Sequence, residues 1–330
     1  MRYLVAFVGA LACSLLLTPA VRALAVRVGA MDEPGEGKVH EKPVPYLGGV
    51  SVYLALLVGA ALGGAVGRAW GLLSAGASVL VLGLYDDLRG CPPKVKLFLL
   101  FVVSTVVVLA GLRPQTIRNP FGGILDLGDM AWPLAVLWLV SSSSSLNLVD
   151  GLDGLAGGVV SVASGFTWAC ALVWGGKVPA SLAAALAGAS LGFLRYNFPP
   201  ARIFMGDAGA LSSGFVLGGI WLMVGPEGSS GLPVGVVVLG LPMVDILAAV
   251  LRRSTSGRSV FSPDLEHVHH RLLRAGLSPR GAVLFLYAVC IFLGIYGLVA
   301  ARLGSGPMEA MGPVGVISAA ALLSVRRRDV

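Results

Sequence analysis

The chain alternates between long apolar segments and short polar connections. Most of these apolar segments are close to the roughly 20 residues that a helix needs to cross a bilayer, and all of them exceed the roughly 10 residues of a membrane-barrel strand. The predicted spans lie at residues 3–24, 47–66, 70–85, 95–111, 131–148, 155–175, 179–195, 208–224, 232–251, 279–302 and 312–325. This pattern predicts an all-α integral membrane protein, a polytopic bundle of about 11 transmembrane helices.

Composition supports a membrane protein and excludes an ordinary soluble domain. Of the 330 residues, 56% are hydrophobic and only 12% are charged, and the mean hydropathy is +0.86. A soluble domain has about 25% charged residues. The spans and their loops use up the chain, so we expect a single polytopic domain over residues 1–330. In the loop 112–130, the alternation at residues 124–127 predicts a small hairpin.

The basic residues are distributed unevenly between the two sets of loops. With a cytoplasmic C-terminus, the cytoplasmic loops are 25–46, 86–94, 149–154, 196–207 and 252–278. Only six of the 24 Lys and Arg residues then fall outside, namely Arg2, Arg68, Arg113, Arg118, Lys177 and Arg302. The positive-inside rule therefore predicts an N-terminus outside and a C-terminus in the cytoplasm. All four histidines fall on the cytoplasmic side, and because the net charge of +7 follows this topology we expect no nucleic-acid partner.

The most informative polar stretch is residues 147–158, between two predicted spans. Asn147, Asp150 and Asp153 stand three residues apart, so on a helix they would share one face. Glycines between them leave room for a ligand near the backbone. A charged residue at the centre of a bilayer costs roughly 2.5–3.5 kcal/mol on insertion scales. Two carboxylates at the end of a span therefore predict a bound cation or a polar substrate.

A second stretch holds Asn197, Phe204 and Asp207 just before the span at 208–224. Asp207 stands where the start of a helix needs a cap, and capping is the structural alternative for it. A carboxylate there also suits Mg²⁺, which takes one or two protein carboxylates together with substrate phosphates. The ring of Phe204 suits stacking on a base, with an aromatic anchor at the membrane interface as its alternative.

Weaker motifs lie in the other cytoplasmic loops. The adjacent carboxylates of Asp86 and Asp87 repel each other and favour a nearby cation, or else they mark a turn. Lys42 suits a phosphate, or it is an ordinary anchor at the membrane surface. The last large loop holds a basic group, His267, His269, His270 and Arg271. Because no cysteines accompany these histidines, an anionic phosphate is the better partner than zinc.

Taken together, these motifs resemble those of the polyprenyl-phosphate N-acetylhexosamine-1-phosphate transferases, glycosyltransferase family 4, a superfamily that includes bacterial phospho-MurNAc-pentapeptide translocase. The matching elements occur in the family order, namely Lys42 to Gly49, Asp86-Asp87, Asn147 to Leu155, Asn197 with Phe204 to Asp207, and His267 to His270. The span count matches as well, so the resemblance covers essentially the whole chain. One position departs, because Ser144 stands where the family often has an asparagine and the chain lacks that amide.

The resemblance implies a reaction and its setting. A polyprenyl phosphate would attack the β-phosphate of a UDP-sugar, release UMP and leave a polyprenyl-diphosphate sugar in the lipid bilayer. The chain would act with Mg²⁺, or Mn²⁺, on UDP-GlcNAc and undecaprenyl phosphate. It would do so at the cytoplasmic face of the cell inner membrane, as the first membrane step of a cell-envelope polysaccharide such as lipopolysaccharide or teichoic acid. A homodimer is an open alternative for its assembly.

The resemblance also implies residue roles. Asp86, Asp87 and Asp207 would be catalytic, with Asp207 and Asp87 as metal ligands and either Asp86 or Asp87 binding or deprotonating the lipid phosphate. Phe204 would stack on uracil. The other substrate-binding residues would be Lys42, Asn147, Asp150, Asp153, Asn197, His267, His269, His270 and Arg271.

The histidine motif distinguishes the branches of this family. His-Val-His-His followed by Arg-Leu-Leu resembles the GlcNAc-1-phosphate branch. The phospho-MurNAc-pentapeptide branch, the alternative, usually has three consecutive histidines followed by an aromatic and an acid. A secondary transporter is an alternative of another class, and Asp245 inside a predicted span is its best support. A CDP-alcohol phosphotransferase also uses paired aspartates, but residues 150–154 do not reproduce its pattern.

Overall fold

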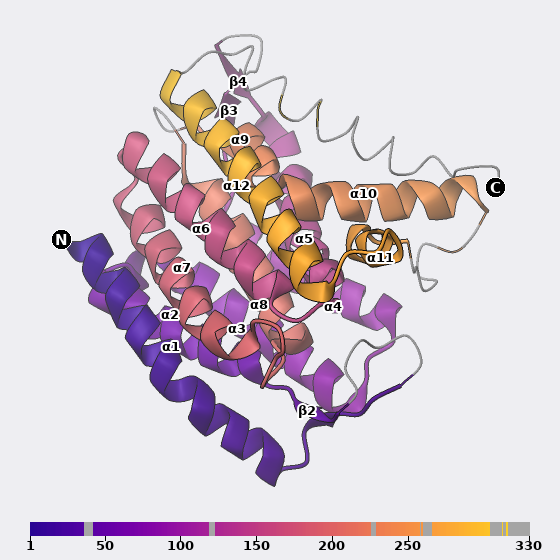
Figure 1. Cartoon of the computed structure of the whole chain (residues 1–330). Coiled ribbons are helices and arrows are strands. Elements are labelled where there is room, and N and C mark those ends of the chain that lie inside the picture. The colour runs from indigo at the N-terminus through magenta and orange to yellow at the C-terminus, as the bar shows by residue number, and fades with distance from the viewer. Residues whose placement is uncertain are drawn as a thin grey trace.

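The computed structural model describes residues 1–35, 42–118, 123–225, 229–257, 259, 266–303, 312 and 315, and most of these are helical (Figure 1). The helices are α1 (Arg2–Arg27), α2 (Gly48–Leu62), α3 (Val66–Arg89), α4 (Pro93–Leu109), α5 (Ala131–Val149), α6 (Leu155–Val173), α7 (Lys177–Asn197), α8 (Gly206–Met223), α9 (Leu232–Val238), α10 (Gly240–Thr255), α11 (Val268–Arg274) and α12 (Pro279–Leu303). A short 3₁₀ turn, Gly128–Met130, precedes α5.

Within these ranges, six helices are long and apolar enough to cross a membrane, or up to seven if the bent pair α9–α10 is one span. The six are α1, α3, α5 with the turn before it, α6, α7 and α12. A multi-pass helical membrane protein is therefore confirmed. Eleven spans and the orientation stay predictions, and the segment 312–325 lies almost entirely outside the described residues.

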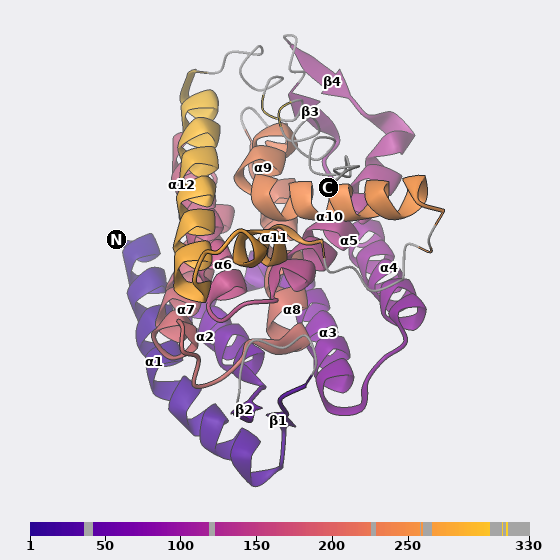
Figure 2. The same ribbon diagram turned by 45° about the vertical axis from the view of Figure 1, so that its right-hand side comes forward.

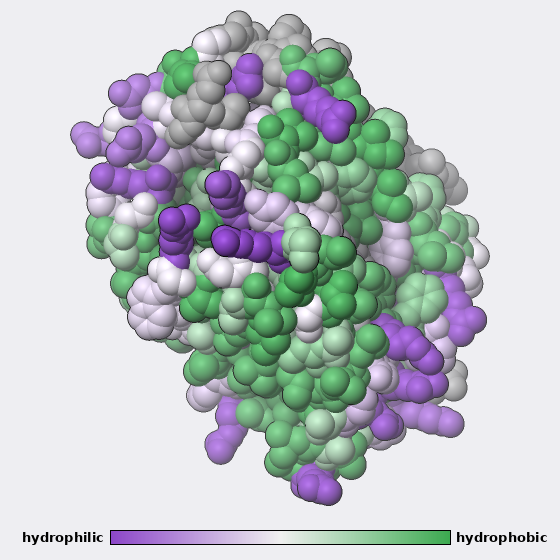
Figure 3. Space-filling model, turned by 90° about the vertical axis from the view of Figure 1, so that its left-hand side faces the viewer, coloured by the Kyte–Doolittle hydropathy of each residue, from purple (hydrophilic) through white to green (hydrophobic). Residues whose placement is uncertain are grey.

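The outer surface has the apolar character that lipid contact requires. Large hydrophobic side chains such as Phe98, Val106, Phe292 and Leu16 are more than half exposed. On the face shown in Figure 3, hydrophobic residues cover most of the central and lower area, and hydrophilic residues gather around it. Exposed apolar surface on this scale marks a membrane or another interaction site rather than a water-facing wall.

The span predicted at 232–251 is not one straight helix, because α9 and α10 meet at a bend of 84°. Pro242 has no N–H to donate to the carbonyl of Val238, the last residue of α9, so the helical ladder is interrupted there. Gly240 at the start of α10 weakens the helix further. As a result α10 runs across the direction of α12 (Figure 2), and it carries Asp245 to the start of α11.

Two small antiparallel sheets lie at opposite ends of the bundle (Figure 2). Met31–Asp32 (β1) pairs with Val44–Pro45 (β2). Thr116–Arg118 (β3) pairs with Ile124–Asp126 (β4), with Ile117 opposite Leu125. The hairpin predicted in the loop 112–130 is confirmed. The sheet β1–β2 lies at the end of the bundle that also holds the polar motifs.

Small residues let the helices that carry the site approach closely. A Cβ on Gly49 at the start of α2 would lie 2.2 Å from the backbone nitrogen of Gly209 in α8, a distance that no side chain tolerates. Ser143 in the five-serine run of α5 donates to the carbonyl of Leu211 in α8 at 2.8 Å. Glycine and serine bring membrane helices together through such contacts. The start of α8 is thereby fixed against both α2 and the last turns of α5.

Candidate active site

The polar motifs converge at one end of the bundle. The backbone of Asp207 bonds to Asp87, and its side chain bonds to Asn147. Asp153 accepts a hydrogen bond from the N–H of Ala201, at 2.8 Å, in the loop between α7 and α8. His269 lies against Gly151, because a Cβ built on that glycine would be 2.3 Å from its Nε2 atom. Segments that are far apart in the sequence therefore form one site.

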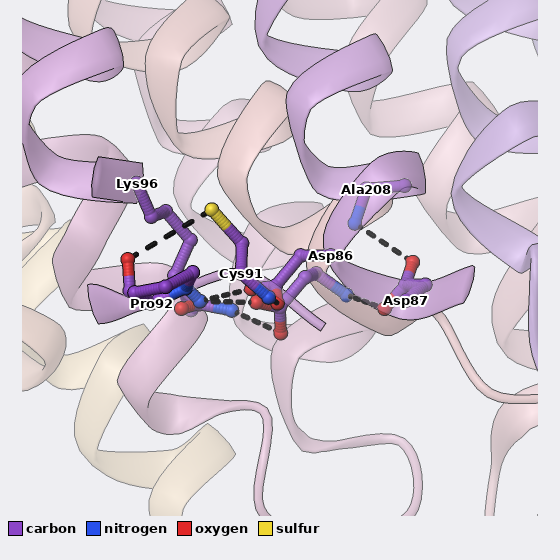
Figure 4. Close-up of polar contacts among 8 residues, drawn as sticks. Asp86, Asp87, Cys91, Pro92, Lys96 and Ala208 are labelled. Atoms are coloured by element: carbon purple, nitrogen blue, oxygen red, sulfur yellow. Dashed lines mark hydrogen bonds and ion pairs between the residues drawn. The ribbon is translucent and has the colours of Figure 1, made fainter. Parts of the chain in front are cut away.

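Asp87, near the end of α3, caps the start of α8. Its Oδ1 accepts the N–H of Asp207 at 2.8 Å, and its Oδ2 accepts the N–H of Ala208 at 3.1 Å (Figure 4). The first N–H groups of a helix have no partner within the helix, so a carboxylate there is stabilising. Gly206 has a φ of 72°, and a Cβ on it would lie 2.6 Å from Asp87 Oδ2. Only a glycine fits this junction.

The carboxylate of Asp207 is directed away from its own helix start. Its Oδ1 accepts a hydrogen bond from Asn147 Nδ2 at 2.7 Å, and its Oδ2 lies 2.5 Å from Lys96 Nζ. The structural alternative, in which Asp207 caps α8, is therefore not what the structure shows, because Asp87 supplies the cap. The carboxylate of Asp207 instead lies toward the last turn of α5 and the first turn of α4.

Lys96 on α4 links two of the predicted catalytic carboxylates. Its ammonium group lies 2.5 Å from Asp86 Oδ2 and 2.5 Å from Asp207 Oδ2. The other oxygen of Asp86 accepts the N–H of Cys91 at 2.6 Å, and Figure 4 shows Asp86 directed toward Cys91 and Lys96 while Asp87 faces Ala208. Lys96 was not among the site residues predicted from the sequence. The available signal was a lysine ten residues after Asp86, across a short loop.

Asp150 adds a further carboxylate to the site. It is half-buried and follows the last residue of α5. Burial raises the pKa of Asp150 well above its ordinary value, and the nearby carboxylates of Asp207 and Asp87 raise it further. A site with this much negative charge favours a bound cation or a bound proton.

The loop before α8 is fixed by hydrogen bonds on both sides. Asn197 donates from Nδ2 to the carbonyl of Ile203 at 2.9 Å, and its Oδ1 is buried with no partner among the described residues. The N–H of Phe204 donates to the carbonyl of Pro45, and its own carbonyl accepts the N–H of Gly48. Phe204 is half-buried, and Lys42 is exposed three residues before Pro45. These bonds place the predicted base-stacking residue beside the predicted phosphate-binding loop.

The histidine motif lies on the other side of the Asp150 loop. His267 Nδ1 lies 2.8 Å from Asp245 Oδ2, and the N–H of Val268 donates to Asp245 Oδ1 at 3.0 Å. The rings of His267 and His269 are nearly parallel, with centroids 5.9 Å apart, and the ring of His270 is 4.3 Å from that of His269. Burial, together with the nearby His270, lowers the pKa of His269 to about 4. The half-buried Arg271 follows on the same short helix, α11.

The residues present fit a hard divalent cation that is held largely by its substrate. In the described ranges, no group of three or more His, Cys, Asp or Glu side chains is arranged to hold a metal ion. Zinc, which takes three or four such ligands, does not suit this arrangement. Mg²⁺ needs only one or two carboxylates when phosphates complete its shell. Asp207 and Asp87 remain the predicted ligands. The position of Lys96 between Asp86 and Asp207 shows that a positive charge is stabilised there.

Fold and site together define a helical membrane protein with an acidic, lysine-bridged site at one end of its bundle. The chain belongs to glycosyl transferase family 4, whose family model matches residues 69–225. It is 37% identical to the probable undecaprenyl-phosphate N-acetylglucosaminyl 1-phosphate transferase of Bacillus subtilis, over 90% of this chain and 85% of the relative.

Two further relatives extend the comparison. A decaprenyl-phosphate N-acetylglucosaminephosphotransferase of Mycobacterium tuberculosis is 34% identical over 94% of this chain and 86% of its own length. The undecaprenyl-phosphate alpha-N-acetylglucosaminyl 1-phosphate transferase of Escherichia coli K12 is 29% identical over 84% and 78%. The family expected from the motifs is therefore confirmed, and the three names agree on GlcNAc phosphate and a polyprenyl phosphate.

Proposed function

We propose that this chain transfers GlcNAc-1-phosphate from UDP-GlcNAc to undecaprenyl phosphate. An oxygen of the lipid phosphate attacks the β-phosphorus of UDP-GlcNAc, and the bond from that phosphorus to the oxygen bridging the two phosphates breaks. UMP leaves with the bridging oxygen, and undecaprenyl-diphosphate GlcNAc stays in the membrane. The names of the relatives support the GlcNAc and polyprenyl parts of this proposal.

The observation that carries the proposal is the frame around Asp207. Asp87 fixes the backbone at the start of α8, while Asn147 and Lys96 fix the two oxygens of Asp207. These partners come from three other helices. A reactive carboxylate needs this kind of fixation, because catalysis depends on positioning to within a fraction of an ångström.

The chemistry requires cations, and the frame is suited to holding them. Two unit charges 4 Å apart repel by about 4 kcal/mol at an effective dielectric of 20, and both substrates are anionic. Carboxylates alone would make this repulsion worse. Mg²⁺ at Asp207, with Asp87 as the second predicted ligand, would neutralise the diphosphate and stabilise the UMP that leaves.

The remaining residues divide between the two substrates. Lys42 and the histidine motif are suited to phosphate oxygens, and the half-buried ring of Phe204 is suited to uracil. Asn197 has a buried amide oxygen without a described partner, which suits a donor on the nucleotide. Asp86 accepts the N–H of Cys91 and pairs with Lys96, so we assign it to holding Lys96, and either Asp86 or Asp87 could serve as the base.

The side of the membrane on which the site lies can be inferred from the loops that meet at this end of the bundle. Polar motifs from the loops 25–46, 86–94, 149–154, 196–207 and 252–278 meet there, and these loops together with the adjoining span ends hold most of the basic residues. We therefore place the site at the cytoplasmic face of the cell membrane, where a lipid and a soluble nucleotide sugar can meet. A transporter is not favoured, because Asp245, its best support, bonds to the start of α11.

The test is UMP release by the purified protein with undecaprenyl phosphate and Mg²⁺. We expect turnover with UDP-GlcNAc and none with UDP-MurNAc-pentapeptide. The opposite preference would place the chain in the phospho-MurNAc-pentapeptide branch. Release of UMP that does not depend on the lipid phosphate would indicate hydrolysis, and the proposed transfer would be wrong.

A further inference from the structure

Asp245 is a buried acid that the proposed chemistry does not use. It lies on α10, just after the bend, and is 2% exposed. Both of its oxygens engage the start of α11, Oδ2 with the imidazole of His267 and Oδ1 with the N–H of Val268. A buried carboxylate costs free energy unless such partners compensate it. The question is therefore what the chain gains from placing a charge at this point.

The contact with His267 fixes the orientation of that ring. An ionised carboxylate can only accept, so Nδ1 of His267 carries the proton in this bond. The ring's other nitrogen, Nε2, is then directed to the opposite side of the imidazole from Asp245. When Nε2 also carries a proton, it can donate a hydrogen bond to an anionic oxygen. Asp245 thus determines which nitrogen of His267 faces away from α10.

The same contact sets the histidine motif against the acidic loop. The rings of His267 and His269 stack in parallel, so the position of His267 constrains that of His269. His269 in turn packs on the backbone of Gly151, next to Asp150. The bend between α9 and α10 is what brings Asp245 to this place. A straight helix over residues 232–251 would carry this residue along the bundle axis instead.

We propose that Asp245 is the positioning residue of the histidine motif: it holds His267 so that Nε2 faces a phosphate of the bound substrates. This inference rests on the proposed function, in which the histidines contact phosphates. A purely structural cap for α11 would need only the bond from Val268 to Oδ1. The second bond, from the imidazole to Oδ2, is the one that a phosphate-binding role requires.

The first test uses nitrogen NMR of the protein labelled at histidine. The chain has only four histidines, so variants of each assign the signals. In the wild type we expect Nδ1 of His267 to carry a proton. In Asp245→Asn, the amide oxygen can keep the bond from Val268 while the amide nitrogen faces Nδ1, so the proton of His267 should move to Nε2. An unchanged His267 spectrum in this variant would overturn the proposal.

The second test is a double-mutant cycle on turnover. Asp245→Asn and His267→Gln should each lower kcat/KM for UDP-GlcNAc by about 10- to 100-fold, the effect of losing one hydrogen bond to a charged group. The double variant should be no worse than His267→Gln alone within about threefold, because one residue acts through the other. Losses that multiply would show that Asp245 has an independent role, contrary to the proposal. Asp126→Asn, in the exposed hairpin, is the matched control and should keep full activity.

The two tests separate the failure of this inference from the failure of the proposed function. If the wild type releases no UMP from UDP-GlcNAc, the proposed function is wrong, and the histidine spectrum still decides whether Asp245 sets the protonated nitrogen. If the wild type is active and the spectrum changes but turnover of Asp245→Asn does not, the ring is positioned for something other than this reaction, and the inference is wrong.

Discussion

Lys96 offers the sharpest prediction about the structure of the site. The change Lys96→Met removes the ammonium group but keeps the length of the side chain, and it leaves Asp86 and Asp207 without their shared counter-charge. We expect the variant to fold with reduced stability. We also expect it to respond more strongly to Mg²⁺, because the ammonium group no longer competes for the carboxylate of Asp207.

The magnitude follows from the two contacts. At 2.5 Å each, and at an effective dielectric of 20, the attraction is about 6–7 kcal/mol per pair before desolvation is subtracted. Removing one partner of a buried ion pair costs about 3–5 kcal/mol. The three side chains are 21%, 13% and 30% exposed, so solvent screens part of this, and we expect a loss of about 2–3 kcal/mol. In a chain of 330 residues, that corresponds to a fall of about 3–4 °C in Tm.

Thermal unfolding followed by tryptophan fluorescence, with and without MgCl₂, measures both effects. Lys94→Met is the matched control, because it removes the same charge from an exposed position two residues earlier on α4. If Lys96→Met melts within 1 °C of Lys94→Met, the ammonium group does not hold the site together. If Mg²⁺ stabilises the wild type and the Lys96 variant equally, the lysine and the metal do not share Asp207.

Three further outcomes are expected. Phe204→Ala should weaken binding of UDP-GlcNAc more than that of undecaprenyl phosphate, as titration of each ligand would show, and equal losses would contradict base stacking. Asn147→Leu should lower kcat by about tenfold or more with little change in Tm, because it removes one donor to Asp207; an unchanged kcat would make that contact incidental. His269 has a pKa of about 4 in the folded protein and about 6.5 in the unfolded chain. Between these pH values the unfolded chain binds more protons than the folded protein. The free energy of unfolding therefore falls by about 3 kcal/mol as the pH drops from 6.5 to 4. His269→Gln should flatten this part of the curve of Tm against pH, and an unaltered slope would assign it to other groups.

Much of the fold could be predicted from the sequence because hydrophobic length is a local property. Each predicted segment from 3–24 to 279–302 contains a helix or, for 232–251, the pair α9 and α10. The bend in that pair was not predicted, although Gly240 and Pro242 were visible. Whether such residues bend a helix or are tolerated depends on the neighbours that satisfy the freed backbone groups, and these belong to the tertiary structure.

The site could be predicted only as a set of residues, not as a set of contacts. Asp86, Asp87, Asn147 and Asp207 were expected to act together, and they do lie together. The pattern did not indicate that Asp87 would cap α8 and so release Asp207 from that task. A capping bond between separate helices leaves no signal at local spacing, since it depends on how the helices pack.

The roles of Lys96 and Asp245 could not be predicted from the sequence, for related reasons. A lysine near a predicted span is ordinarily an anchor, and only the packing of α4 beside α5 and α3 shows that it bridges two acids. An acid inside a span suggests ion transport until the bend turns it toward α11. In both cases, the partner that explains the charge lies on another element.

The most direct test of the central claim is turnover by Asp207→Asn. The variant keeps the backbone N–H groups that Asp87 caps, so we expect a folded protein. We predict that UMP release from UDP-GlcNAc falls at least about 1,000-fold, on the scale of losing a group that stabilises transition-state charge, whereas Asp126→Asn keeps the wild-type rate. A rate for Asp207→Asn within tenfold of the wild type would contradict a transfer site built around this carboxylate.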